Sequence, residues 1–436
     1  MGMFRRVRVE EYRQQLYRTT YRHGDLVEPD LVVQLDSFTG KPASARKLQA
    51  VSPFSPYPLQ MLVEEDWGYS KAHVATWEKE HQHHVGVLDA IGARYLQFDQ
   101  LDDAERCFKR CVELSASRHL YERLADVYAR RGDRQQWQAT LDAFLAKPDY
   151  ALDHASIRVR VANHFMDERQ WDQALPYAKA AAETHAAWAM DCLVRCYESM
   201  HNYDEGEKWL LERINHYGSG EFMWYSWCRR TGHGDLAAAR AAVETRLTRE
   251  GESASGVSAG MFLLCEDRLE EAYQAFARQQ LANKDPAAGL LAATVAAELE
   301  ETDDRDAALE LVISEGGKYQ LNGQRRNSLI ALAQMWLRTL QSEKPAIDAG
   351  KLKKLHDKAD FDQLYIDYFA SRILDNEDRA DEAETFLRLC ASLPRDHIAC
   401  TLARTRLREQ GLDPDAAPDE HPDKTVPSAA EPVTPE

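Results

Sequence analysis

Two helical patterns of apolar residues, joined by a short polar turn, lie within residues 85–116. The apolar positions recur every three or four residues, as expected for one face of a helix, and they are Leu88, Ile91, Tyr95, Leu101, Phe108 and Cys111. Bulky side chains at these positions would fill the seam between two antiparallel helices. The small residues Gly92 and Ala104 would let the two helices approach closely. The stretch therefore predicts one helix pair.

A single helix pair leaves its outer faces uncovered, so the stretch predicts further copies along the chain. The anchor of the second pattern recurs with spacings of 33, 37, 32, 33, 33 and 36 residues, and then of 75 residues for two units. The anchors are Leu101, Arg134, Trp171, Tyr203, Leu236, Leu269, Arg305 and Ala380. A small residue follows each anchor three positions later, except at Trp137, where we expect a slightly splayed pair.

The spacing and the order of bulky and small residues resemble the tetratricopeptide repeat (TPR) family over residues 70–412. The resemblance implies an all-α fold, a right-handed TPR-like α-solenoid of antiparallel helix pairs. Residues 397–410 would form a polar capping helix, and the acidic, proline-rich residues 413–436 would form a disordered tail. The number of repeats around residues 323–362 stays open. The family implies a binding module but does not say what is bound.

Residues 1–69 precede the repeats and are interpreted as an N-terminal arm. We expect a helix over residues 1–24, a strand-like run at residues 31–35 and an extended polyproline path at residues 52–58, where three prolines disfavour helix. Residues 1–50 carry nine Lys/Arg against six Asp/Glu on a chain of net charge −18. This charge favours packing of the arm on the acidic repeats, and a loosely ordered leader is the alternative.

Composition restricts the classes of partner. The net charge of −18 disfavours general nucleic-acid binding, which needs a clustered basic face, and it disfavours an anionic membrane surface. The longest apolar run, residues 287–297, is too short to span a bilayer, which takes about 20 residues. The N-terminus lacks the apolar core of a secretory signal. Eight cysteines without framework spacing predict a reducing compartment, so we expect a cytoplasmic protein.

The sequence holds no catalytic motif, and we expect no catalytic residues, no metal ligands and no cofactor. Neither the GxxxxGK[ST] phosphate loop nor the HExxH zinc motif occurs. Two thiol pairs at helical spacing lack further metal ligands and are interpreted as core residues: Cys107 with Cys111, and Cys192 with Cys196. The histidine-rich residues 73–84 could hold a metal only with help from another element. A metal-dependent helical-repeat enzyme using this segment is an alternative function, and a solvated helix is the simpler interpretation.

The resemblance also assigns residues to a concave groove, because in TPR proteins the first helix of each pair lines that surface. The inward positions are His119, Glu122 and Asp126 in the second unit, Asn163 in the third, Trp188, Asp191 and Arg195 in the fourth, and Glu221 and Trp224 in the fifth. Asparagine bonds a peptide backbone, arginine a carboxylate, and indoles apolar side chains. We therefore predict an extended peptide along Asn163, Arg195 and Trp224. The alternative is that these residues merely line the surface.

Some TPR proteins bind the C-terminal carboxylate of heat-shock chaperones through a lysine–asparagine clamp. Asn163 matches one position of the clamp, but Val159 and Cys192 replace the lysine and the second asparagine. We therefore expect no binding of chaperone tails. The predicted function is a non-enzymatic scaffold or adaptor for a protein or peptide partner. An RNA-associated helical repeat is the second alternative, for which only residues 5–22 and 351–358 supply clustered basic charge.

Overall fold

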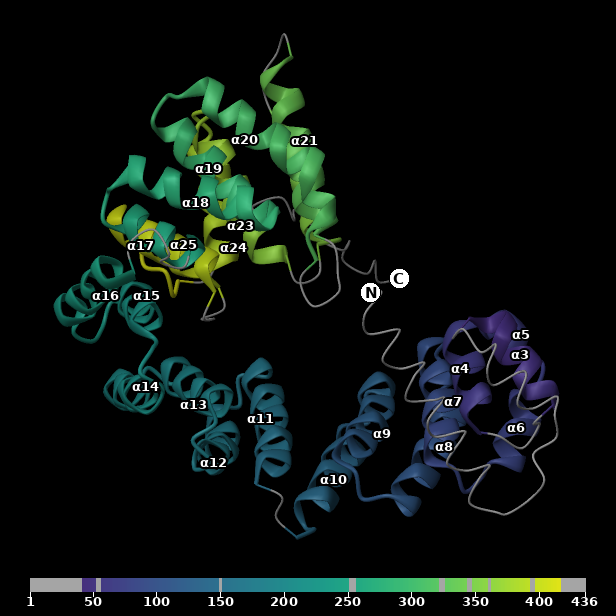
Figure 1. The fold of residues 1–436 in the computed structure, drawn as a ribbon. Helices are drawn as coiled ribbons and strands as arrows, with labels where there is room; N and C mark the ends of the chain where they lie inside the picture. Colours follow the sequence, from purple (N-terminus) through teal and green to yellow (C-terminus); the bar gives the residue numbers. More distant parts are fainter. Residues whose placement is uncertain are drawn as a thin grey trace, which may run out of the picture. The chain divides into compact units, whose positions relative to one another are not determined.

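The computed structural model describes most of the chain, in eight stretches: residues 41–51, 56–148, 151–250, 256–320, 326–342, 347–359, 362–392 and 397–416. All regular secondary structure in these stretches is helical (Figure 1). The chain divides into two compact units, Met1–Glu168 and Arg169–Glu436, and each unit is described by itself. The helix expected at residues 1–24, the strand-like run and nearly all of the tail lie outside the described residues.

Unit 1 begins with short helices and continues with helix pairs. Its helices are α3 (Pro42–Val51), α4 (Pro56–Glu65), α5 (Trp67–Ser70), α6 (Val74–Glu80), α7 (Val85–Gln97), α8 (Leu101–Leu114), α9 (Arg118–Arg131), α10 (Arg134–Leu145) and α11 (Leu152–Asp167). The helices pack mainly on their neighbours in sequence: α7 on α8, α8 on α9, and α9 on α10. Helices α4 and α6 contact α7.

The part of the arm that the structure describes is helical and not extended. Pro56 and Pro58 lie in the first turn of α4, where a missing backbone N–H costs little because that turn leaves its N–H groups unbonded. The extended path predicted for residues 52–58 is therefore wrong at residues 56–58, and residues 52–55 lie outside the described residues. Leu62 of α4 is fully buried, and Arg94 of α7 donates a hydrogen bond of 2.9 Å to the carbonyl of Val63. The described end of the arm therefore packs on α7 of unit 1.

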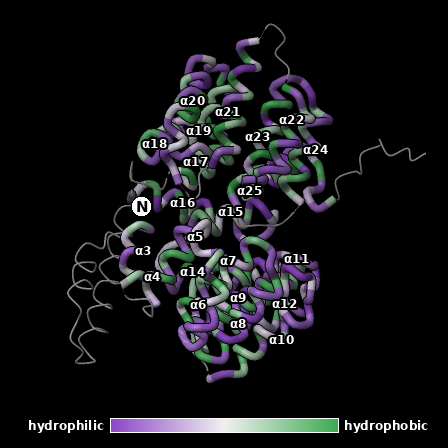
Figure 2. Tube along the Cα trace, turned by 90° about the vertical axis from the view of Figure 1, so that its right-hand side faces the viewer, coloured by the Kyte–Doolittle hydropathy of each residue, from purple (hydrophilic) through white to green (hydrophobic). Residues whose placement is uncertain are grey.

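Unit 2 contains the remaining helix pairs. Its helices are α12 (Trp171–Ala182), α13 (Ala187–Ser199), α14 (Tyr203–Tyr217), α15 (Glu221–Thr231), α16 (Leu236–Glu250), α17 (Gly256–Cys265), α18 (Leu269–Asn283), α19 (Pro286–Glu298), α20 (Thr302–Glu315), the 3₁₀ helix η2 (Gly316–Lys318), α21 (Asn327–Leu340), α22 (Ala349–His356), α23 (Gln363–Asp375), α24 (Ala380–Ala391) and α25 (Ile398–Glu409). Most helices carry both hydrophobic and hydrophilic residues, as the colouring in Figure 2 shows.

One backbone conformation marks the turn before the second helix of a pair. A residue with positive φ lies two positions before that helix at Asp99, Gly132, Arg169, His201, Gly234, Asp267, Glu300 and Asp378. The helix that follows starts at the predicted anchor in every case but one. Helix α20 starts at Thr302, so the predicted anchor Arg305 is wrong by one turn and the true spacing from Leu269 is again 33 residues. Asp303 and Asp304 in the first turn of α20 favour this earlier start, because carboxylates stabilise helix N-termini.

Close approach within a pair depends on glycine facing phenylalanine. A methyl group on Gly92 would lie 2.9 Å from the Phe108 ring, which is closer than packing allows. The same contact recurs in unit 2, where a methyl group on Gly260 would collide with the ring of Phe276. The expected exception, Trp137, is buried, and its ring centroid lies 4.2 Å from that of His164 in α11. Whether that pair is splayed stays a prediction.

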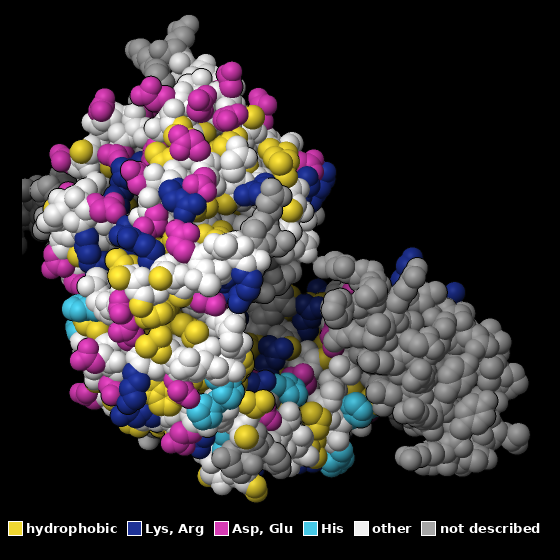
Figure 3. All heavy atoms as spheres, turned by 60° about the vertical axis from the view of Figure 1, so that its left-hand side comes forward, with side chains coloured by type: hydrophobic (Ala, Val, Ile, Leu, Met, Phe, Trp, Pro, Cys, Tyr) yellow, Lys and Arg dark blue, Asp and Glu magenta, His cyan; other side chains and the backbone are white. Residues whose placement is uncertain are grey.

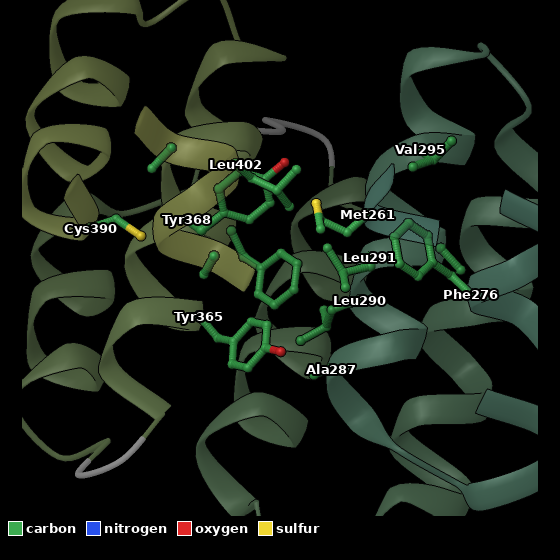
Figure 4. Close-up of a cluster of buried hydrophobic side chains, with 14 of the residues drawn as sticks. Met261, Phe276, Ala287, Leu290, Leu291, Val295, Tyr365, Tyr368, Cys390 and Leu402 are labelled. Atoms are coloured by element: carbon green, nitrogen blue, oxygen red, sulfur yellow. The ribbon is translucent and has the colours of Figure 1, made fainter. Parts of the chain in front are cut away.

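The second half of unit 2 departs from an open repeat array. Repeats in an open solenoid contact only their neighbours, but here α25 packs on α15 and α17, and α23 packs on α19 and α21. We call the helices from Glu221 to Glu409 the closed lobe. Figure 4 shows side chains of α17, α19, α23 and α25 that point toward one another in its core, among them Met261, Leu290, Leu291, Tyr365, Tyr368 and Leu402.

Helix α25 is a largely buried helix of the closed lobe. The prediction of a polar capping helix is wrong, because most of α25 is buried, including Leu402, Ala403 and Leu407. The hydroxyls of Ser226 in α15 and Thr401 in α25 lie 2.7 Å apart. The Nε of buried Arg404 donates to the carbonyl of Arg230 at 3.0 Å. Long-range hydrogen bonds thus fasten the last helix to α15.

The core of the closed lobe is built from the same positions that the TPR resemblance assigns to a groove. Counting back from the observed starts of α20 and α24, the first three of these positions are Ala287, Leu290 and Thr294 in α19, and Tyr365, Tyr368 and Arg372 in α23. All six side chains are buried, whereas the last two positions of each helix are partly exposed or exposed. Residues 286–296 of α19 are buried on every side, which explains the long apolar run in the sequence. In α19 and α23 these groove positions face the protein's own helices, whereas Glu221 and Trp224 of α15 are only partly buried.

Candidate protein-binding surface

The predicted groove residues fall in both units. Glu122, Asp126 and Asn163 belong to unit 1, whereas Trp188, Asp191, Arg195 and Trp224 belong to unit 2. In unit 1, Asp126 of α9 forms an ion pair with Arg160 of α11. Glu122 lies 3.9 Å from Arg118 on its own helix. The first helices α9 and α11 therefore lie side by side, as the repeat register predicts.

In unit 2, helices α13 and α14 expose two large aromatic side chains next to a fixed ion pair. Trp188 of α13 is 43% exposed and Tyr217 of α14 is 45% exposed. Asp191, one turn after Trp188, lies 2.6 Å from the Nε of Arg213. The Tyr217 hydroxyl donates a 2.7 Å hydrogen bond to the carbonyl of His185. We call Trp188, Asp191, Arg213, Tyr217 and His185 the Trp188 surface.

The local sequence holds this surface in place. Tyr217 is the last residue of α14, and Gly218 ends the helix in the left-handed conformation that glycine adopts easily. The guanidinium of Arg213, one turn earlier, lies 5.8 Å from the Tyr217 ring centroid. The His216 ring stacks on that of His185 at 5.3 Å. The exposed Tyr217 side chain is therefore held by Arg213 of its own helix and by His185, which precedes α13.

Two further predicted groove residues of unit 2 are Arg195, which lies on α13, and Trp224, which lies on α15. The indole N–H of Trp224 donates a 2.8 Å hydrogen bond to Glu207 of α14, and the backbone N–H of Asp235 donates to the same oxygen at 2.8 Å. Glu207 therefore links α14 to α15. Arg195 is half-buried on α13. That these two residues bind a partner stays a prediction.

Sequence reasoning missed the contribution of α14. The predicted positions all lie on first helices, whereas Arg213, His216 and Tyr217 come from a second helix. The sequence signal that could have indicated this surface is the i,i+4 spacing of Arg213 and Tyr217, because residues at this spacing share one face of a helix. Their neighbours Trp188 and Asp191 lie on the first helix that the register assigns to them, and their role in binding a partner stays a prediction.

The histidines of residues 73–84 have structural roles in unit 1. His73 stacks on Trp77 at 5.4 Å, and the Nδ1 of His84 accepts a 3.3 Å hydrogen bond from the backbone of Val87, which caps α7. Burial lowers the pKa of His81 and of His84. Within the described stretches, no group of three or more His, Cys, Asp or Glu side chains is arranged to hold a metal ion.

The two thiol pairs at helical spacing are core residues, as predicted. Cys107, Cys111, Cys192 and Cys196 are buried and form no disulfide. Burial raises the pKa of Cys111 and of Cys196 to about 12, and that of Cys192 to about 11. A thiol with so high a pKa carries little thiolate at neutral pH, so these cysteines are poor nucleophiles.

Charges are mixed over the surface. On the face that Figure 3 shows, Lys/Arg and Asp/Glu side chains are interspersed, with hydrophobic side chains between them. Many charged side chains of the described residues form ion pairs, such as Arg268 with Glu244 and Arg240 with Glu266. None of the described helices combines the length and the hydrophobicity that crossing a bilayer requires.

The helix pairs, their positive-φ turns and the recurring anchors form an all-α, TPR-like solenoid. In fold, this is a TPR-like helical-repeat protein. No protein-family model matches the chain, and no curated protein sequence does. These comparisons therefore place the chain in no named family.

Two of the solved structures that match the chain do so at low identity and low TM-score. One is the structure of Naa15/Naa10 bound to HypK-THB, with 14% identity and a TM-score of 0.29, covering 91% of this chain and 66% of that one. This chain thus spans slightly less than two thirds of that protein. The other is the P58(IPK) TPR domain, with 12% identity and a TM-score of 0.21, covering 92% and 99%.

Proposed function

We propose that this protein is a non-enzymatic scaffold of the cytoplasm that binds a protein or peptide partner, and that the Trp188 surface is a principal contact. The observation that carries the proposal is the pair of exposed aromatic rings, Trp188 and Tyr217, held beside the Asp191–Arg213 ion pair. Trp, Tyr and Arg are the residues that most often dominate binding energy at protein interfaces.

The proposed partner is an extended segment with an apolar side chain beside an acidic one. The apolar side chain would cover the Trp188 ring, which exposes 43% of its surface to water. The acidic side chain would meet the guanidinium groups of Arg213 and Arg195, since charge-assisted hydrogen bonds to arginine are strong and directional.

Quantitative affinity purification of the tagged full chain tests the proposal. We expect Trp188→Ala to lower the recovery of specific partners about tenfold, as the loss of one central aromatic contact does. The matched control is Leu281→Ala in α18, which removes a large apolar side chain that is even more exposed, at 58%. Recovery of every wild-type partner by Trp188→Ala would show that the Trp188 surface is not the binding site.

Arg195→Glu gives a second test of the same surface. Charge reversal adds repulsion toward an acidic partner, so its effect should exceed that of Arg195→Ala. Both variants should retain the circular dichroism spectrum and the thermal midpoint of the wild type, because Arg195 is half-buried and not a core residue. Equal recovery with both variants would argue against an acidic residue in the partner.

A further inference from the structure

The described part of the chain ends close to the helix pair that carries the Trp188 surface. Asp415 lies 2.6 Å from the buried Arg404, whose Nε donates to the carbonyl of Arg230 in α15. The side chain of Arg230 forms a buried ion pair of 2.8 Å with Glu198, near the end of α13. Burial first, and then the Asp415 carboxylate, raises the pKa of Tyr203, the first residue of α14. The chain therefore leaves the described structure beside the turn between α13 and α14.

The Trp188 surface lies at the other end of the same two helices. Trp188 is the second residue of α13, and Tyr217 is the last residue of α14. Helix α14 has 15 residues and is therefore about 20 Å long. About one helix length thus separates the surface from the place where residues 417–436 begin.

Residues 417–436, which we call the proline-rich segment, are long enough to reach this surface and to lie along it. In a polyproline path, which advances about 3.1 Å per residue, roughly seven residues cover that distance. More than half of the segment is then left for contact. Attachment to the same chain gives a ligand an effective concentration of millimolar order, so a contact of weak intrinsic affinity is still populated.

The proline-rich segment repeats the chemistry proposed for a partner of the Trp188 surface. A proline and an acidic residue are neighbours at four places: Pro418–Asp419, Pro422–Asp423, Glu431–Pro432 and Pro435–Glu436. Proline-rich peptides bind to aromatic side chains and lose little entropy on binding, because the proline backbone is already restricted. Carboxylates form strong hydrogen bonds to arginine. The exposed rings of Trp188 and Tyr217, with Arg213 beside them, offer both kinds of contact.

We propose that the proline-rich segment binds the Trp188 surface of its own chain and competes there with the protein partner. Because competition requires that a partner binds this surface, the inference rests on the proposed function. A partner must displace the segment, so its apparent affinity falls in proportion to the fraction of chains whose surface is uncovered.

Hydroxyl-radical footprinting of the full chain, read by mass spectrometry, measures how far water reaches the rings of Trp188 and Tyr217. The test variant keeps the length and the charge of the segment but removes its prolines: Pro418→Ser, Pro422→Ser, Pro427→Ser, Pro432→Ser and Pro435→Ser. We expect the oxidation rates of both rings to rise about threefold or more, as they would if the segment covers the surface in two thirds of the chains or more. The rate of Phe98, which is 51% exposed in unit 1, should stay the same.

The matched control variant changes small residues of the same segment and keeps every proline: Ala417→Ser, Ala429→Ser and Ala430→Ser. It should oxidise at wild-type rates. Equal rates at Trp188 in the wild type and the proline variant would overturn the proposal. If Trp188 is then protected in both proteins and more so at higher protein concentration, the occupant is a second copy of the chain. If it is exposed in both, the surface is open to other proteins alone.

Affinity purification separates this inference from the proposed function. The proline variant should recover about threefold or more of each specific partner than the wild type does, since its surface is uncovered. Unchanged recovery would contradict the competition. Recovery that depends on Trp188, with a footprint that the proline variant leaves unchanged, would contradict the inference and leave the proposed function standing. A footprint that changes while Trp188→Ala retains every partner would contradict the proposed function and support the intramolecular contact.

Discussion

The helix pairs α7–α10 of unit 1 and the closed lobe of unit 2 use the same hairpin but differ in what their first helices present. In both, glycine on the first helix meets phenylalanine on the second, at Gly92 and at Gly260. The inward positions of α9 are the charged Glu122 and Asp126, whereas one of the corresponding positions of α19 is the buried Leu290. The charged positions of α9 lie among helix pairs that pack mainly on their neighbours in sequence, whereas Leu290 lies in the core that closes the lobe.

This comparison limits where a partner can bind. In the closed lobe, Tyr365 and Tyr368 of α23 occupy inward positions, and both are buried in the core that Figure 4 shows. A ligand in a groove there would have to displace the protein's own helices. The helices before the closed lobe keep exposed aromatic and charged residues at the same positions, such as Trp188 and Asp191. The proposed binding surface therefore precedes the closed lobe in sequence.

The largest expected effect comes from giving α19 the polarity of α9. Leu290→Glu places a carboxylate in the core of the closed lobe, where no cation is paired with it, and should lower the free energy of unfolding by about 3–5 kcal/mol. Chemical denaturation followed by circular dichroism measures the change. Glu122→Leu is the reciprocal control and should change stability by less than about 1 kcal/mol. Similar losses in the two variants would mean that the two first helices do not differ as described.

The second prediction concerns what the two regions share. Leucine at Gly92 or at Gly260 would press against the facing phenylalanine, and overpacking of this kind costs about 1–3 kcal/mol. We expect both variants to fall in this range by thermal denaturation. Gly317→Leu is the control, because no heavy atom lies within 4 Å of a methyl group built there. A loss of stability in only one of the two variants would mean that the helix pairs containing Gly92 and Gly260 do not pack in the same way.

The third prediction concerns the end of the closed lobe. Residues 413–416 lie in the segment predicted to be disordered, but the carbonyl of Asp413 accepts a 3.0 Å hydrogen bond from Arg388, and Asp415 lies 2.6 Å from the buried Arg404. Truncation after Gly411 should therefore lower stability by about 1–2 kcal/mol, because it leaves Arg404 without its carboxylate. Truncation after Ala416 keeps both contacts. Equal thermal midpoints for the two truncations would contradict a role for Asp415.

The smallest effect is expected in the open part of unit 1. Arg160→Ala removes the ion pair with Asp126, whose side chain is 38% exposed. Exposed pairs of this kind contribute about 0–1 kcal/mol, because water and salt screen them. Urea denaturation of the variant at low and high salt should show a loss within that range that shrinks as salt is added. A loss of several kcal/mol would mean that α9 and α11 depend on this contact far more than an open array should.

The sequence predicts the helix pairs well because their signals are local. Seven of the eight predicted anchors, Arg305 being the exception, coincide with the first residue of a second helix, since spacing and turn residues act within one pair. The closure by α25 was missed because Ser226 and Thr401 are 175 residues apart, and no local pattern reports such a contact. The uniform apolarity of residues 287–297 was the available signal for a helix buried on all sides.

The candidate site could likewise be predicted only where its residues follow from signals within one helix pair. Trp188 and Asp191 follow from the repeat register, which places them on the first helix of a pair. Arg213 and Tyr217 required knowledge of how α14 packs beside α13, and the register assigns no binding role to second helices. Trp224 has the expected place in sequence, but its hydrogen bond to Glu207 could not be inferred from spacing.

The fastening of α15 by α25 also determines when the closed lobe can form during protein synthesis. Ser226 leaves the ribosome 175 residues before Thr401, which corresponds to roughly 9–35 s at 5–20 residues per second. The pairs α7–α10 can fold as soon as each second helix emerges, because their contacts are local. The apolar faces of α17, α19 and α23 must wait for the end of the chain. In that interval the nascent protein exposes the surface that chaperones recognise, so we expect newly made chains, and not the folded protein, to be the form most prone to aggregation.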